Sequence, residues 1–68
     1  MATPAEVRRE IKRRGLPYDV YKTKHCWYVV DGDASGWYES SLHTNTFANR
    51  PASYWVDAIQ FMRDQYSA

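Results

Sequence analysis

One short segment, residues 31–36, combines the residue types that bind calcium, with the sequence Asp-Gly-Asp-Ala-Ser-Gly. This run matches the first six positions of an EF-hand loop, in which side-chain oxygens coordinate the cation. The twelfth position of that loop requires a bidentate glutamate, but Leu42 stands there. Asp, Ser and Gly are also the residues that tight turns between strands prefer. We therefore predict a strand-to-strand turn that binds no calcium.

Two histidines and one cysteine, His25, Cys26 and His43, are the other candidates for a metal site or a thiol active site. His25 and Cys26 are adjacent, so in a strand their side chains point to opposite faces of the sheet. No further ligand or orienting residue stands at a recognisable spacing, and Cys26 has the character of a small buried residue. Glycine-rich phosphate loops and cofactor fingerprints are also missing from the sequence. We expect no enzymatic activity, no metal and no cofactor.

Basic residues near the N-terminus could bind phosphate groups. Residues 1–25 carry a net charge of +4 and residues 26–68 a net charge of −3, so the chain is electrically bipolar. On a helix, the residues that could contact a nucleic-acid backbone are Arg8, Arg9, Lys12 and Arg13. The alternative is an ordinary solvated helix face on which neighbouring glutamates pair with arginines at helical spacing.

Aromatic residues form the second candidate surface. Eleven of the 68 residues are aromatic, and several are adjacent, as in Trp27-Tyr28, Trp37-Tyr38 and Tyr54-Trp55. Neighbouring rings in a strand face opposite sides of a sheet, so one aromatic face could remain open for base stacking or for a protein partner. The candidates for partner binding are Trp27, Trp37, Tyr54 and Phe61. The alternative for the two tryptophans is burial in the core.

These residues need elements to position them, and the first is a helix predicted over residues 4–14. Thr3 is a suitable N-cap, and Glu6 stands where a capping box places its carboxylate. Gly15 fits the left-handed position that follows a helix. The apolar stripe of this helix is narrow, so the helix must dock on another element to persist.

Three strand-like runs and a second helix follow. The runs are rich in aromatic or β-branched residues and span residues 18–22, 26–31 and 37–42. The second helix is predicted over residues 52–66, with an apolar stripe of Trp55, Ile59, Met62 and Tyr66. We therefore predict one α+β domain over residues 1–68 in which a three-stranded antiparallel sheet lies between two helices in sequence (αβββα).

Composition also predicts the cellular setting. A single cysteine and the lack of an apolar leader or membrane span indicate a reducing, cytoplasmic environment without a membrane partner. No repeat or low-complexity tract interrupts the chain.

The element order resembles that of the double-stranded RNA-binding domain. That family opens its second helix with a lysine cluster that grips phosphates, whereas residues 51–55 here read Pro-Ala-Ser-Tyr-Trp and Arg50 is the cation nearby. Three strands followed by a helix also resemble the small DNA-binding domains of integrases. Neither resemblance transfers a site residue to this chain.

The favoured hypothesis is a small non-enzymatic adaptor or inhibitor, of the compact kind common among phage and mobile-element products, that binds an unidentified protein. The alternative is a nucleic-acid-binding domain that uses the basic first helix and exposed sheet aromatics. A third possibility is a homodimer formed through Tyr54 and Phe61.

Overall fold

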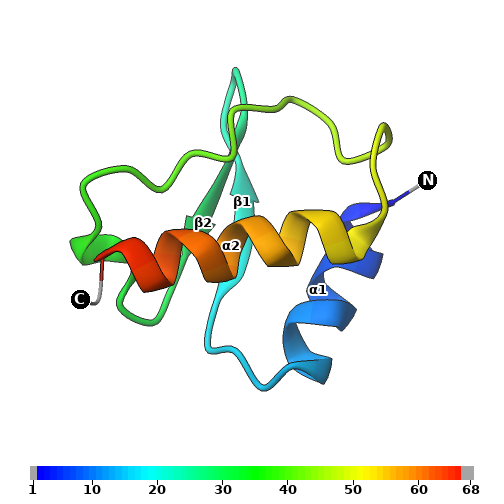
Figure 1. Ribbon diagram of the computed structural model, residues 1–68. Helices are drawn as coiled ribbons and strands as arrows, with labels where there is room; N and C mark the ends of the chain where they lie inside the picture. The colour runs from blue at the N-terminus through cyan, green and yellow to red at the C-terminus, as the bar shows by residue number, and fades with distance from the viewer. Residues whose placement is uncertain (1, 67–68) are drawn as a thin grey trace.

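The computed structural model describes residues 2–66 and shows a small α+β domain (Figure 1). Its elements are α1 (Pro4–Arg13), β1 (Asp19–Lys22), β2 (Trp27–Val30), a short 3-10 helix η1 (Ala34–Gly36) and α2 (Ala52–Tyr66). The α+β class and the two predicted helices are therefore confirmed. The ends of the predicted domain, residues 1, 67 and 68, lie outside the described residues.

The boundaries of α1 follow from its caps. The Glu6 amide donates to Thr3 Oγ1 at 3.2 Å and the Thr3 amide donates to Glu6 Oε1 at 2.9 Å, which completes a capping box. At the other end Gly15 adopts φ 69°, and the Leu16 amide donates to the Ile11 carbonyl at 3.1 Å. This is the Schellman arrangement that glycine favours because it has no Cβ.

The sheet is a hairpin of β1 and β2 with one buried face. The strands are antiparallel, and Val20 lies opposite Val29 while Tyr21 lies opposite Tyr28. Val20 and Val29 are buried, whereas Tyr21 on the other face is exposed. Because facing residues share a side of the sheet, the hairpin presents one apolar face to the core and one tyrosine-bearing face to solvent.

The prediction of a third strand over residues 37–42 is wrong. This segment makes a single isolated β-bridge, between Ser41 and Tyr28. The amide of Leu42 donates to the Trp27 carbonyl at 2.9 Å, as in a regular ladder. The Trp27 amide, however, donates to the Thr44 carbonyl, whereas in a regular antiparallel ladder it would donate to the Leu42 carbonyl. After this bridge, His43 adopts a left-handed φ of 55°, which ends the extended backbone that further pairing requires.

The core gathers side chains from both helices, the hairpin and the long connection before α2. Figure 1 shows α2 crossing the hairpin, and α1 contacts both α2 and β1. From the connection, Phe47 is buried between Trp27 and Trp55, with ring centroids 4.7 and 5.4 Å away. Trp55 Nε1 also donates to the Phe47 carbonyl at 3.0 Å. The long connection is thus fixed to α2 by packing and by a buried hydrogen bond.

The predicted stripe of α2 is partly confirmed. Trp55 and Ile59 are buried, while Met62 and Tyr66 are partly buried at the core's margin. Val56 is also fully buried, although it lay outside the predicted stripe. Among residues 2–66, neither helix has the length and apolar character needed to cross a membrane.

Candidate functional site

The structure corrects the expectation that Trp27 or Trp37 is exposed. Each is only 9% exposed. Trp37 packs between Tyr18 and Tyr66, with ring centroids at 5.2 and 5.9 Å. Its Nε1 is buried and has no hydrogen-bond partner within the described residues. Both tryptophans belong to the core, as the alternative interpretation held, and little of either ring is exposed to a partner.

The other two predicted rings, Tyr54 and Phe61, lie on the surface of α2 and are 46% and 69% exposed. They line an open groove of about 610 Å³ between α2 and residues 39–43. The apolar side chains of this groove are Leu42, Tyr54, Ala58, Phe61, Met62 and Tyr66. The structure therefore brings these two predicted residues into one site, which we call the α2 groove.

One wall of the α2 groove is a row of side chains along the helix. Tyr54, Ala58, Phe61 and Gln65 are three or four residues apart and therefore share one face of α2. From residue 54 to residue 65, this row is about 16 Å long at a rise of 1.5 Å per residue. The groove thus follows most of the helix.

The opposite wall is the extended segment that fails to become a third strand. The Ser41 amide donates to Glu39 Oε1, and the His43 amide donates to Ser41 Oγ, both at 3.0 Å. Glu39 and His43 also approach to 4.0 Å. These local bonds engage two backbone donors of the segment.

The electrostatic character of the α2 groove is acidic. Its lining includes two carboxylates, Glu39 and Asp57, and no Lys or Arg among the described lining residues. Arg50 lies beyond the lining, 5.1 Å over the Tyr54 ring. Asp57 pairs with Arg14 at 2.7 Å, so the groove combines an apolar surface with negative charge that comes mainly from Glu39.

The predicted phosphate-binding residues do not form one uniform cationic face. Arg8 donates to Asp19 at 2.9 Å and to the Val20 carbonyl at 3.1 Å, so it covers a backbone acceptor at the outer edge of β1. Arg13 forms two hydrogen bonds with Glu10, at 2.8 and 2.6 Å. Both guanidinium groups are thus paired with carboxylates within the fold, although the Arg13 side chain is still 69% exposed.

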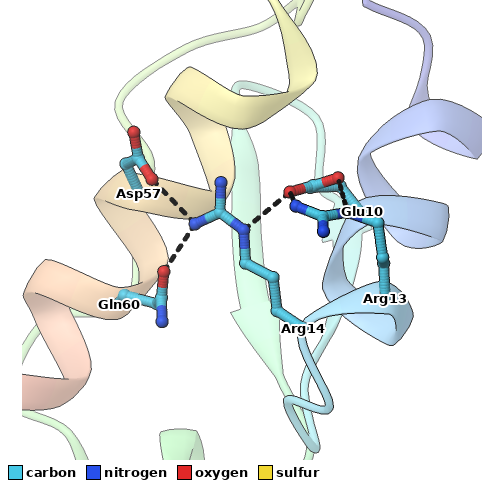
Figure 2. A network of polar contacts seen from close by, with 5 residues as sticks. All are labelled: Glu10, Arg13, Arg14, Asp57 and Gln60. Carbon is cyan, nitrogen blue, oxygen red and sulfur yellow. Dashed lines mark hydrogen bonds and ion pairs between the residues drawn. The ribbon is translucent and has the colours of Figure 1, made fainter.

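Arg14 connects the two helices through three acceptors (Figure 2). It donates to Glu10 Oε2 and to Asp57 Oδ1, each at 2.7 Å, and also to Gln60 Oε1. The side chain is only 17% exposed. Hydrogen bonds from Arg13 and Arg14 lower the pKa of Glu10 to about 2. The cluster formed by Glu10, Arg13, Arg14, Asp57 and Gln60 is called the α1–α2 clasp below.

Arg9 and Lys12 are the exposed cations of the predicted set that remain. Neither makes a hydrogen bond or ion pair with the described part of the chain. They border a shallow depression together with Ala5 and Arg8. This surface offers two exposed cations and little apolar area.

The calcium-like turn is held by an internal contact. Tyr18 donates its hydroxyl hydrogen to Asp33 Oδ1 at 2.6 Å, and burial together with this bond raises the Tyr18 pKa to about 12. A Cβ on Gly32, which has φ 55°, would lie 3.0 Å from the Tyr18 ring. These contacts give Asp33 and Gly32 structural roles in the turn. The absence of calcium binding stays a prediction.

The candidate metal and thiol residues are not assembled into a site. Cys26 is half-buried, with Sγ 3.3 Å from Ser41 Oγ, whereas His25 and His43 are exposed. Within residues 2–66, no three His, Cys, Asp or Glu side chains lie close enough together to hold a metal ion.

Comparisons of the chain with protein-family models, curated proteins and solved structures found no match. A functional inference must therefore come from the chemistry and geometry of the sites themselves.

Sequence reasoning missed the second wall of the groove, including Glu39 and His43. The helical spacing of Tyr54, Ala58 and Phe61 was a usable signal for the first wall. No local signal indicated the second, because it is placed by hydrogen bonds to β2, from the Val29 amide to the Ser40 carbonyl and from the Leu42 amide to the Trp27 carbonyl.

Proposed function

We propose that the protein is a small non-enzymatic adaptor or inhibitor that binds another protein through the α2 groove. The main support is the pair of exposed rings, Tyr54 and Phe61, on the wall of an open apolar groove. Exposed apolar surface that lines a concavity is typical of interaction sites. Tyrosine, phenylalanine and methionine are also enriched in protein interfaces.

The fold supports a rigid wall for such an interface. Trp55 and Ile59 bury the opposite side of α2, and the α1–α2 clasp ties the same helix to α1. A groove on a well-anchored helix requires little ordering when a partner binds, which favours affinity. The half-buried thiol of Cys26 is compatible with the cytoplasmic setting that we propose.

The nucleic-acid alternative has weaker support. Two of its four predicted contact residues, Arg8 and Arg13, already pair with carboxylates, which leaves Arg9 and Lys12. Its predicted stacking rings, Trp27 and Trp37, are buried. Nonspecific binding gains affinity with each phosphate neutralised, so two cations support only weak, salt-sensitive association.

Affinity capture from the native host tests the proposal, with immobilised wild-type protein and two variants. Phe61→Ala truncates a ring in the groove, and Tyr38→Ala truncates a ring that is 96% exposed outside it. We expect to capture a protein partner. Phe61→Ala should weaken its free energy of binding by at least ~2 kcal/mol, and Tyr38→Ala should leave this free energy unchanged. Recovery of nucleic acid alone, or of a partner that Phe61→Ala binds equally well, would contradict the proposal.

A further inference from the structure

We infer that the occupant of the α2 groove is an amphipathic helix of a partner protein, with an apolar stripe flanked by Lys or Arg. This inference rests on the proposed function and specifies the chemistry of the partner. It combines three properties of the groove: its length, the state of its backbone donors and its charge.

The length of the groove accommodates a short helix. The row from Tyr54 to Gln65 extends for about 16 Å, which equals about 11 residues of helix or about five residues of extended strand. Apolar partner residues spaced at i, i+4 and i+7 would lie along Tyr54, Ala58 and Phe61, which have the same spacing on α2. Such packing of a helix into an apolar groove is a recurring mode of recognition.

The backbone of the second wall disfavours an added strand. Strand addition requires free amide donors along the edge of the receiving segment. Here the Ser41 amide is engaged by Glu39, and the His43 amide is engaged by Ser41. The left-handed φ of His43 also bends this edge. A helix satisfies its own backbone and needs no donors from the wall.

The charge of the groove selects a cationic occupant. Glu39 approaches His43 at 4.0 Å and, among the described residues, forms no ion pair with a Lys or Arg. Asp57 remains 69% exposed even though Arg14 donates to it. Lysine or arginine at the borders of the partner's apolar stripe would therefore meet exposed carboxylates at the rim.

A second copy of this chain fits the groove poorly. A symmetric dimer through the α2 groove would place the Glu39 and Asp57 carboxylates of both copies in one interface, which is repulsive. The basic face of α1 would supply opposite charge, but among the described residues that border the depression at Arg9 and Lys12, Ala5 is the single apolar side chain. A different protein is therefore the occupant that the surface favours.

Selection from a displayed peptide library tests this inference. Each library member is a helical peptide of about 14 residues, long enough to span the groove, with leucines at i, i+4 and i+7. The positions beside this stripe are randomised among Lys, Gln and Glu. The full chain is used as bait in parallel with Phe61→Ala, Glu39→Gln and Tyr38→Ala, and thermal melts confirm that each bait is folded.

We expect Lys to be enriched over Glu by at least ~tenfold on the wild-type bait at low salt, where exposed charges are least screened. The Phe61→Ala bait should no longer bind these peptides. The Glu39→Gln bait should bind them with a smaller preference for Lys. The Tyr38→Ala bait should behave like wild type. Peptides that depend on Phe61 but show no Lys preference would overturn the inferred partner and leave the proposed function intact. A selection with no Phe61-dependent peptide would contradict both.

Discussion

The two helices use their surface residues in opposite ways. On α1, two of the four cations predicted to bind phosphate, Arg8 and Arg13, pair with carboxylates within the fold, and so does the neighbouring Arg14. On α2, Tyr54 and Phe61 remain exposed beside a groove. A charged residue with an internal partner contributes to the structure, whereas an apolar residue without a cover is available for binding. The comparison favours α2 as the functional surface.

The largest predicted effect separates the two sides of α2. We expect Ile59→Ala to lower the free energy of unfolding by about 2–5 kcal/mol, because it leaves a cavity in the core. Trp55→Ala should cost about 3–5 kcal/mol and also removes the bond to the Phe47 carbonyl. Chemical denaturation measures both values.

The matched control is Phe61→Ala, on the exposed side of the same helix. It should change the free energy of unfolding by no more than about 0.5 kcal/mol, as surface substitutions usually do. A similar loss for Phe61 and Ile59 would show that the assigned inner and outer sides of α2 are wrong.

The next effect concerns the α1–α2 clasp. Arg14→Met keeps an apolar stem but removes the hydrogen bonds to Glu10, Asp57 and Gln60. We expect a loss of about 1–2 kcal/mol, reduced from the usual value for charged hydrogen bonds because Asp57 is exposed. Thermal unfolding at low and high salt provides the measurement.

Arg9→Met on the same helix is the control for the clasp, because Arg9 pairs with no carboxylate of residues 2–66. It should leave the melting temperature nearly unchanged. Equal losses for Arg9 and Arg14 would mean that the clasp does not connect the helices energetically.

A smaller effect appears in the dependence of stability on pH. The pKa of Glu10 is lowered from 4.5 to about 2 in the folded chain, so its stabilising contribution is present above pH 4.5 and is lost as the pH falls toward 2. We expect Glu10→Gln to melt at a lower temperature than wild type near neutral pH. The two melting curves should converge on acidification. Parallel curves across this range would contradict the assigned pairing.

The smallest effect is expected on the basic side of the molecule. Binding to generic DNA at low salt should be weak and should vanish near physiological ionic strength. Arg9→Ala together with Lys12→Ala should lower the salt slope by up to about two, because each phosphate contact contributes about one unit. A tight complex that persists at physiological salt and is abolished by this double substitution would instead establish α1 as the functional surface.

The sequence predicted the elements whose signals are local. The ends of α1 were predictable because Thr3, Glu6 and Gly15 act on backbone groups within a few residues. The third strand was not, although residues 37–42 have strand-like composition. Its pairing with β2 is limited to the bridge between Ser41 and Tyr28, and the left-handed backbone of His43 that follows has no clear signature in the sequence.

For the same reason, the sequence predicted one wall of the α2 groove and not the other. Tyr54 and Phe61 were found from residue type and helical spacing, but the facing wall depends on contacts between distant segments. Burial of Trp27 and Trp37 depends on Phe47 and Tyr66, which lie far away in sequence. Ring chemistry alone therefore did not distinguish core from surface.

The most direct test of the α2 groove is an amide chemical-shift titration of the full chain with a Lys-flanked helical peptide from the library. We predict saturable shifts concentrated in residues 39–43 and along α2 from Tyr54 to Tyr66, with α1 from Ala5 to Lys12 nearly unaffected. Shifts concentrated on α1 around Arg9 and Lys12, with the groove unperturbed, would contradict the account.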